Sequence, residues 1–375
     1  MKRTLVHCRV TSHHYAVRKV TFSLLNNLVY DEKINQIVLA VNKNNIDLFK
    51  QKFGEKYQLA VIPIHSDNAL LNQLFNILIL PFMLLKWRID QIIFPQISFF
   101  VYLPAKSFIY IHDLIEFSLA NQTKIRLIAR KFFFRLTAYQ SKHIFTVSHF
   151  SKSEIVHWLN VKPNKVTVAY NGIEHNEFDY LNSKAQPPRE NIIKILNSKY
   201  FLYVGYLAYP QKNINFSIEG FERLVEETNS DISFILVGKD GPNFETIHNK
   251  IKTSKYSSKI YRYKDISEVE LNLLYGNALS LVYCSLAEGF GMPVAEAMAL
   301  GCPVICSNKT SLPEVAGDAS ILIEPDSISS LVDEMKNILE LSNYDRSIIA
   351  KKQKENAKKF SWHEHGRIVS EVVFK

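Results

Sequence analysis

Apolar and polar positions along this chain follow two different periods. Short apolar runs, such as INQIVLAV (34–41) and YQLAVIPI (57–64), are separated by longer segments whose apolar residues recur three and four positions apart, such as 14–29 and 215–228. The first period is typical of buried strands and the second of amphipathic helices. Strands that alternate with helices over this length predict parallel, doubly wound α/β sheets.

The alternation occurs twice, which predicts two sheets. The first set of strands is expected at residues 4–10, 34–41, 57–64, 89–95, 106–113, 141–148 and 165–172. The second set is expected at residues 200–207, 232–241, 279–285, 303–307 and 320–325. Residues 181–197 between them are polar, contain Pro187 and Pro188 and show no sustained period, so this segment is the best linker candidate.

Composition agrees with two α/β domains. The chain has 375 residues, of which 47% are hydrophobic, and this is too long for one typical core. Its four cysteines show no metal-ligand spacing, and we expect buried thiols in a reducing cytosol. The N-terminus lacks the apolar stretch of a signal peptide, and the longest apolar segment, 74–87, is shorter than the ~20 residues that span a bilayer.

Charge is unevenly distributed. Residues 1–185 hold 23 lysines and arginines against 12 acids, whereas residues 186–375 hold 22 against 24. Segments 70–88 and 124–143 combine basic and aromatic side chains, which predicts peripheral attachment to an anionic membrane surface on the cytoplasmic side. Alternatively, the apolar residues pack on the sheet and the charges are simply solvated. Nucleic acid fits less well, because no nucleic-acid motif accompanies the charge.

A Gly-Phe-Gly turn carries the most informative chemistry. Glu288 and Glu296 stand on either side of it, with seven residues between them. Pro293 suits the first position of a helix and Gly301 the position just after its end, so a helix is expected over 293–300. The free N–H groups of that helix and the missing side chains of the two glycines predict a phosphate site.

The two acids fit the groups on either side of a diphosphate. Glu296, at the end of the first helical turn, is placed to reach ribose hydroxyls. Glu288 precedes the bend, and we expect it to point into an open cleft and meet sugar hydroxyls. A plainer interpretation stays open, because the helix dipole stabilises a first-turn glutamate by ~0.3–1 kcal/mol without any ligand.

The string EGFGMPVAE (288–296) resembles the E-x7-E motif of retaining GT-B glycosyltransferases, in particular the large family 4 group. Other strings resemble segments of the same group in the same order and together cover nearly the whole chain. They are IYIHDL (109–114), FTVSHFSKSEI (145–155), AYNGIEHNEF (169–178), YVGYLAYPQKN (203–213), FILVGKDG (234–241), ISEVELNLLYGNALSLVYCSLAEGFG (266–291), SLPEVAGDASILIEPD (311–326) and FSW (360–362). This ordered combination is far more specific than one motif.

The resemblance implies the GT-B fold, in which two Rossmann-like domains face a central cleft. The domains would be residues 1–183, on the acceptor side, and 198–359, which would bind the nucleotide-sugar donor, with 184–197 as linker. The amphipathic C-terminal helix 360–375, with Trp362, Ile368 and Val372 on one face, would return to the first domain. The resemblance also implies a retaining mechanism by front-face attack, in which the leaving phosphate takes the acceptor proton, and no metal or other cofactor.

The candidate catalytic residues follow from the same resemblance. Lys212 matches the phosphate-binding lysine and would stabilise charge on the leaving diphosphate. Glu288 matches the sugar-contacting glutamate, and Glu296 the ribose-binding one. His112 matches a histidine that contacts the transferred sugar, with Asp113 placed to orient its ring; the alternative is a core histidine at a strand end. The candidate donor-binding residues are Gly205, Gln211, Lys212, Asn213, Gly238, Glu288, Gly289, Phe290, Gly291, Met292, Pro293, Val294 and Glu296.

Two positions depart from the family pattern. Gln211 stands where an arginine is usual, so the charge of the leaving group would depend more on Lys212 and the helix start. The first strand–helix loop, residues 11–19, has no glycine. His13 and His14 in this loop, together with Asn171, are the candidate acceptor-side residues.

The sequence therefore predicts a hexosyltransferase that makes surface polysaccharide or lipopolysaccharide. GDP-mannose is the favoured donor and UDP-hexoses are close behind, and the acceptor would be a glycan or a lipid-linked glycan. A non-catalytic sugar-binding subunit is the main alternative. A dinucleotide-dependent oxidoreductase fits less well, because no G-x-G-x-x-G motif follows a strand.

Overall fold

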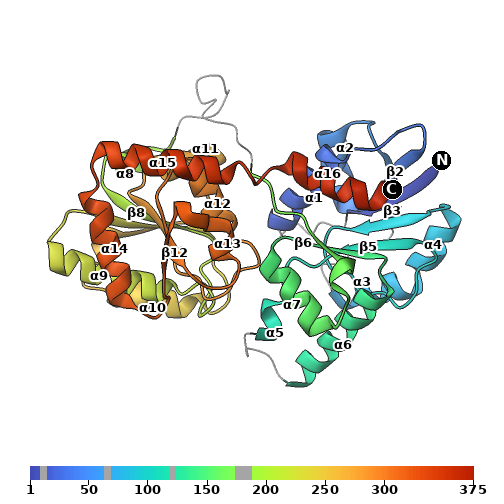
Figure 1. The fold of residues 1–375 in the computed structure, drawn as a ribbon, viewed down its shortest axis with the longest axis horizontal. Helices are drawn as coiled ribbons and strands as arrows, with labels where there is room; N and C mark the ends of the chain where they lie inside the picture. The colour runs from blue at the N-terminus through green and yellow to red at the C-terminus, as the bar shows by residue number, and fades with distance from the viewer. Residues whose placement is uncertain (9–14, 63–68, 119–123, 174–187) are drawn as a thin grey trace. The chain divides into compact units, whose positions relative to one another are not determined.

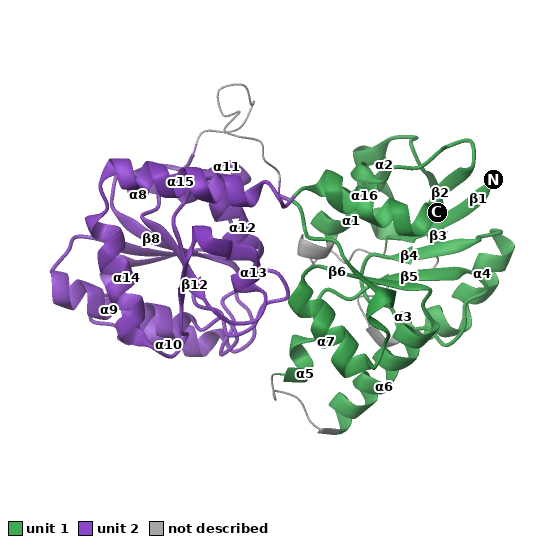
Figure 2. Ribbon diagram, in the orientation of Figure 1, with its two compact units in different colours: residues 1–172, 361–375 green, residues 173–360 purple. Residues whose placement is uncertain are grey.

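A computed structural model describes residues 1–8, 15–62, 69–118, 124–173 and 188–375 (Figure 1). The chain divides into two compact units (Figure 2). Unit 1 comprises residues 1–172 and 361–375, and unit 2 comprises residues 173–360. Each unit is built on one parallel sheet with helices on both faces, which confirms the predicted α/β class.

Seven parallel strands form the sheet of unit 1, in the order β3-β2-β1-β4-β5-β6-β7. They are β1 (Lys2–His7), β2 (Asn35–Asn42), β3 (Gln58–Ile62), β4 (Gln91–Phe94), β5 (Lys106–Tyr110), β6 (His143–Thr146) and β7 (Val166–Val168). Each overlaps an apolar run from which a strand was predicted. The central strand β1 lies between β2 and β4 and buries its residues from Thr4 to His7. Leu5 and Val6 are apolar, and the Thr4 hydroxyl accepts a hydrogen bond from the Gln91 amide.

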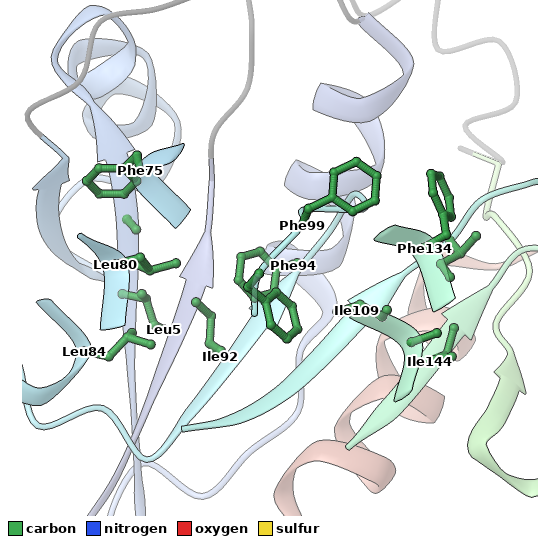
Figure 3. Close-up of a cluster of buried hydrophobic side chains, with 14 of the residues drawn as sticks. Leu5, Phe75, Leu80, Leu84, Ile92, Phe94, Phe99, Ile109, Phe134 and Ile144 are labelled. Atoms are coloured by element: carbon green, nitrogen blue, oxygen red, sulfur yellow. The ribbon is translucent and has the colours of Figure 1, made fainter. Parts of the chain in front are cut away.

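The helices of unit 1 form two layers. They are α1 (Tyr15–Asn27), α2 (Ile46–Phe53), α3 (Ala69–Leu78), α4 (Leu80–Lys86), α5 (Ile115–Ser118), α6 (Lys124–Gln140), α7 (His149–Leu159) and α16 (Trp362–Phe374). Helices α3, α4, α6 and α7 cover one face, where Phe75, Leu80, Leu84 and Phe134 join one buried cluster with strand residues such as Ile92 (Figure 3). Helices α1, α2 and α16 cover the other face.

The C-terminal helix α16 is part of unit 1 and packs on α1. Trp362 is buried as expected, but Ile368 and Val372 are only partly buried. The buried face runs instead through Gly366, Val369 and Val373. The expected face was therefore only partly right. The reason is that Gly366 has no side chain, so the backbone of α1 approaches this face closely; a Cβ here would lie 2.1 Å from the carbonyl oxygen of Asn27.

Six parallel strands form the sheet of unit 2, in the order β10-β9-β8-β11-β12-β13. They are β8 (Tyr200–Val204), β9 (Ser233–Val237), β10 (Ile260–Tyr263), β11 (Ser280–Tyr283), β12 (Val304–Ser307) and β13 (Ile321–Ile323). The sequence predicted all of them except β10. This strand lies at the sheet edge and only Ile260 in it is buried, so it has no continuous apolar run.

The helices of unit 2 are α8 (Glu190–Leu196), α9 (Ile214–Thr228), α10 (Phe244–Thr253), α11 (Glu268–Asn277), α12 (Met292–Ala299), α13 (Leu312–Ala316), α14 (Ile328–Glu340) and α15 (Asn343–Ala357). Helix α9 packs on α14 over one face of the sheet, whereas α12 packs on α15 over the other (Figure 1). The carboxyl ends of β8 and β11 are neighbours, so the loops that follow them meet at one edge of the sheet.

The segment predicted as a linker differs from that expectation in its second half. Residues 190–196 form α8, which belongs to unit 2. Ile192 and Ile195 are buried, and the Arg189 guanidinium before the helix pairs with Glu270 of α11 at 2.8 Å. Seven residues, about two turns of helix, are too few for the helical period to be recognised beside two prolines. The first half of the predicted linker lies outside the described residues.

Two further expectations concern cysteines and membrane spans. All four cysteines are buried free thiols, as predicted, and burial raises the pKa of Cys302 to about 12. Within the described ranges, no helix is both long and apolar enough to cross a membrane.

Candidate functional site

A buried ion pair lies at the carboxyl edge of the unit 2 sheet. The Lys212 ammonium, in the loop after β8, lies 2.6 Å from Oε1 of Glu288, in the loop after β11. The hydroxyl of Tyr283, the last residue of β11, donates to the same Oε1 at 2.8 Å. Burial and the Glu288 carboxylate raise the pKa of Tyr283, so its phenol stays protonated and remains a donor. Lys212, predicted to bind the diphosphate, and Glu288, predicted to bind the sugar, are therefore in direct contact.

The environment of Glu288 differs from the expected open cleft. Glu288 is only 8% exposed, because its carboxylate turns to Lys212 and Tyr283 rather than to solvent. A buried carboxylate needs such partners to offset its lost hydration. Both hydrogen bonds fall on Oε1, and within the described residues Oε2 receives none. One oxygen of Glu288 is thus left to contact a ligand.

Gln211 fixes the Lys212 loop against the motif loop. Its side-chain amide donates to the carbonyl oxygen of Ala287 at 3.0 Å, and its backbone carbonyl oxygen accepts from the backbone N–H of Leu286 at 2.9 Å. The Ser285 hydroxyl also donates to this carbonyl oxygen. Gln211 thus has a structural task at the position where family members usually have an arginine.

Two hydroxyl residues that the sequence analysis missed hold the other side of the motif loop. The backbone N–H of Glu288 donates to Oγ1 of Thr310 at 3.0 Å. The Ser311 hydroxyl lies 2.9 Å from the carbonyl oxygens of both Glu288 and Phe290. Both residues follow β12, the strand next to β11. A cluster of hydroxyl residues directly after a predicted strand was the available signal.

The bend places a helix start beside the ion pair. Gly291 has φ of +105° and precedes α12, whose first residue is Met292 rather than the expected Pro293. Within the part of the chain that the structure describes, the N–H groups of Gly291 and Met292 donate to no acceptor. Free N–H groups at a helix start attract anions. Gly301, with φ of +72°, follows the end of the helix as predicted.

Glu296 lies on α12 about one turn from this start. Its carboxylate is partly exposed, and Oε2 accepts a hydrogen bond from the Tyr275 hydroxyl of α11 at 3.3 Å. Burial and the Glu296 carboxylate raise the pKa of Tyr275, so this phenol also stays a donor. Two carboxylates, each hydrogen-bonded to a tyrosine, therefore flank a helix start that has free N–H groups, near the Lys212 ammonium.

Comparison with known protein families identifies the family of this chain. The family described as "Glycosyl transferases group 1" matches residues 188–360, and "Glycosyltransferase Family 4" matches residues 35–177. This chain belongs to the family 4, group 1 glycosyltransferases. The two matches divide between the two units of the structure, and the first of them contains Lys212, Glu288 and Glu296.

Two relatives of this chain are named for mannose transfer. The chain is 30% identical over 222 residues to O-antigen chain mannosyltransferase B of Escherichia coli, covering 59% of this chain and 58% of the relative. It is 30% identical over 233 residues to O-antigen chain mannosyltransferase RfbU of Salmonella typhimurium, covering 62% and 61%. The chain thus spans about three fifths of the length of these curated relatives.

Solved structures share the whole fold. WaaG, a glycosyltransferase involved in lipopolysaccharide biosynthesis, aligns with a TM-score of 0.72 at 13% identity over 99% of each chain. HepE from Anabaena, solved in complex with UDP, aligns with a TM-score of 0.73 at 14% identity over the full length of both chains. The chain therefore has the predicted GT-B fold.

The other donor-side candidates lie near this edge. Gly205 and Gly238 directly follow β8 and β9 with φ of +146° and +149°, and a Cβ on Gly238 would lie 1.9 Å from the Gly205 carbonyl oxygen. Glycine is thus required there by the close approach of the two strands, with or without a ligand. Asn213 begins α9 and binds the Pro325 carbonyl oxygen, and Val294 is fully buried, so only its backbone is available. Gly289 and Phe290 are buried within the bend.

The candidate catalytic residue His112 and the acceptor-side candidate Asn171 lie in unit 1. His112 follows β5, and its Nε2 lies 3.0 Å from the Pro95 carbonyl oxygen, which can only accept, so Nε2 carries the proton. Burial lowers the pKa of His112, which leaves the ring neutral with Nδ1 as an acceptor. Asp113 accepts from the backbone N–H of Ile115. Asn171 is buried, and its Oδ1 has no hydrogen-bond partner in the described part of the chain.

A second histidine, which the sequence analysis missed, lies behind His112. The Tyr110 ring packs against His112, and its hydroxyl donates to Nε2 of His365 at 2.9 Å. Nδ1 of His365 donates to the Tyr170 carbonyl oxygen at 2.8 Å. The C-terminal helix α16 is thereby tied to the strand that carries His112.

The last two expectations concern the first loop and metal binding. His13 and His14 lie outside the described residues. Within the described ranges, no group of three or more metal-ligand side chains occurs.

Proposed function

We propose that this chain is a retaining, metal-independent hexosyltransferase. It takes a nucleotide-diphosphate sugar as donor and a saccharide or lipid-linked saccharide as acceptor in the biosynthesis of surface polysaccharide or lipopolysaccharide. The observation that supports this most is the Lys212–Glu288 pair beside the start of α12, with Glu296 on the same helix. The transfer step itself, its donor and its acceptor are inferences from family membership and this geometry.

In the proposed mechanism, Lys212 and backbone N–H groups stabilise the negative charge of the diphosphate. The free N–H groups of Gly291 and Met292 bind phosphate oxygens, and Lys212 stabilises the charge that develops as the sugar–phosphate bond breaks. Glu296 binds the ribose hydroxyls and Oε2 of Glu288 binds the sugar. The leaving phosphate takes the proton of the attacking acceptor hydroxyl, so no side chain is required as base.

Mannose is the favoured sugar and GDP-mannose the favoured donor. The support is that two relatives are named O-antigen chain mannosyltransferases and a third, of Mycolicibacterium hassiacum, is named an MMP alpha-(1->4)-mannosyltransferase at 27% identity. UDP-hexoses are the second choice, since HepE was solved with UDP and the proposed mechanism assigns the site residues only to diphosphate, ribose and sugar, not to the base.

A panel of nucleotide sugars tests the proposal. Thermal unfolding and donor hydrolysis would be measured with GDP-mannose, UDP-glucose, UDP-galactose and the free nucleotides. A true donor at 100 times its dissociation constant should stabilise the folded state by about 2.7 kcal/mol. Glu296→Ala should lose this shift, whereas Glu340→Ala, which removes an exposed carboxylate from α14, should keep it. No shift with any nucleoside diphosphate would refute the transferase.

A non-catalytic sugar-binding subunit is the second candidate. Gln211 favours it, because an amide replaces a cation that family members usually supply to the leaving group. Stabilisation by a nucleotide sugar without hydrolysis or transfer, in the presence of a range of saccharide acceptors, would support this candidate over the enzyme.

We also propose a cytoplasmic protein that attaches peripherally to the membrane, where a lipid-linked acceptor would be found. Its support is the excess of basic residues in the first half of the chain, 23 against 12 acids in residues 1–185.

A further inference from the structure

The outer surface of one helical layer in unit 1 is apolar where a surface helix is ordinarily polar. On α3 and α4, Leu78, Phe82 and Leu85 are exposed at positions i, i+4 and i+7, and Phe82 is 72% exposed. The inner faces of the same helices bury Phe75, Leu80 and Leu84. Helices that are apolar on both faces ordinarily have a partner on each.

Helix α6 repeats this pattern on the same face of the sheet. Ile125, Ile128 and Phe132 are exposed at positions i, i+3 and i+7, and Ile125 is 83% exposed. Its inner face buries Phe134, which belongs to the same buried cluster as the inner residues of α3 and α4 (Figure 3). The exposed apolar positions therefore lie on the outside of one continuous layer. We call this outer surface of α3, α4 and α6 the α3–α6 surface.

Charge on the α3–α6 surface has one sign. The three helices contain six lysines and arginines and no aspartate or glutamate. Some cations are engaged: Arg130 pairs with Glu116 of α5, and Lys131 lies over the Trp158 ring. Lys86 and Arg126 are exposed and have no acidic partner among the described residues. Unit 1 as a whole has 24 basic and 11 acidic residues, a net charge of +13, against −4 for unit 2.

We propose that the α3–α6 surface is the membrane-contacting surface of this protein and binds an anionic lipid bilayer. Aliphatic and aromatic side chains enter the boundary between headgroups and acyl chains, while lysines and arginines beside them contact lipid phosphates. A second copy of this chain fits less well, because a self-complementary interface here would bring basic surface against basic surface with no acid to meet it. Delivery of the chain to a lipid-linked acceptor rests on the proposed function, whereas vesicle binding does not depend on it.

Co-sedimentation with vesicles tests the proposal. The full chain would be mixed at 150 mM salt with vesicles of phosphatidylglycerol and phosphatidylethanolamine, or of phosphatidylcholine alone. We expect binding to the anionic vesicles and little to the neutral ones. Lys86→Glu with Arg126→Glu should lower the partition coefficient at least about tenfold. Lys351→Glu with Lys352→Glu, which changes the net charge equally on exposed positions of α15, should change it less than about twofold.

The apolar part of the surface has its own pair of variants. Phe82→Ser with Ile125→Ser should lower binding, whereas Tyr344→Ser, at a comparably exposed aromatic of unit 2, should not. No sedimentation of folded protein with anionic vesicles would overturn the proposal, and so would equal losses in the α3–α6 and control variants. A concentration-dependent dimer that Phe82→Ser abolishes would also overturn it and assign the surface to self-association.

The two proposals fail separately. Donor hydrolysis without vesicles should be unchanged in the surface variants, because none of the substituted residues belongs to the donor site. Vesicle binding by a chain that no nucleotide sugar stabilises would refute the transferase and leave the membrane surface intact. Donor hydrolysis without vesicle binding would do the reverse.

Discussion

The buried His365 should make the stability of unit 1 depend on pH. His365 is 1% exposed on α16, and its two ring nitrogens are used by the Tyr110 hydroxyl and the Tyr170 carbonyl oxygen. Burial lowers its pKa from the ordinary value of 6.5 to about 4. Protonation would also remove the acceptor that the Tyr110 hydroxyl needs. The neutral ring is therefore the form that the folded state keeps.

The sign and size of the effect follow from proton linkage. Between pH 6.5 and about 4 the unfolded chain binds a proton at His365 and the folded chain does not, so the free energy of unfolding falls as the pH falls through this range. With these two pKa values, lowering the pH from 7 to 5 should cost about 2 kcal/mol at this residue. His365→Gln removes the titration and should remove that part of the pH dependence.

Intrinsic fluorescence offers a selective assay. The three tryptophans, Trp87, Trp158 and Trp362, all belong to unit 1, so urea unfolding followed by tryptophan emission reports on this unit alone. Unfolding free energies of the wild type and His365→Gln would be compared at pH 7 and pH 5. Other titrating groups, His143 among them, are shared by both proteins and cancel in the difference. Parallel pH dependence of the two proteins would refute the reasoning.

Three further variants test particular contacts. Lys212→Met should lower turnover at least about 10²-fold and destabilise unit 2, because it leaves the buried Glu288 carboxylate without its cation. Adding Glu288→Gln should recover stability in calorimetry but not turnover. A double variant no more stable than the single one would contradict the ion pair. Gly238→Ala should destabilise unit 2 by about 3 kcal/mol or more, since its Cβ would strike the Gly205 carbonyl oxygen; an unchanged melting temperature would exclude this clash. Gly366→Ala should lower the stability of unit 1 in the fluorescence assay, although alanine is about 1 kcal/mol more favourable than glycine within a helix. A more stable variant would show that α16 does not pack closely on α1.

Strands and the motif turn were predictable because their signals are local. A buried parallel strand is a continuous apolar run, and the helix α12 is bounded by a proline and a glycine whose positions are read directly from the sequence. Strand β10 was not predicted because it lies at the sheet edge, where only Ile260 is buried and the strand has no continuous apolar run. The helix α8 was not predicted because its seven residues, about two turns, are too few to establish a helical period.

The pairing of Lys212 with Glu288 was not predictable, because 76 residues separate them and their contact depends on which strands are neighbours. Family resemblance assigned a role to each, but only the placement of β8 beside β11 brings their loops together. Thr310 and Ser311 joined the site for the same reason, through β12. Long-range strand order is thus the part of the site that local patterns do not contain.

The return of α16 to unit 1 has a consequence for the order in which the protein can fold during synthesis. Unit 2 is one continuous segment, 173–360, whereas unit 1 needs residues 361–375 to cover one face of its sheet, where Val369 and Val373 of α16 complete a buried cluster. A ribosome makes the chain from the N-terminus, and domains generally fold as units as they emerge. Unit 2 can therefore complete its sheet before unit 1 is finished, although the sheet of unit 1 is synthesised first. Until then the apolar side of α1 lacks its cover, so the first-made half of this protein is the last to become stable.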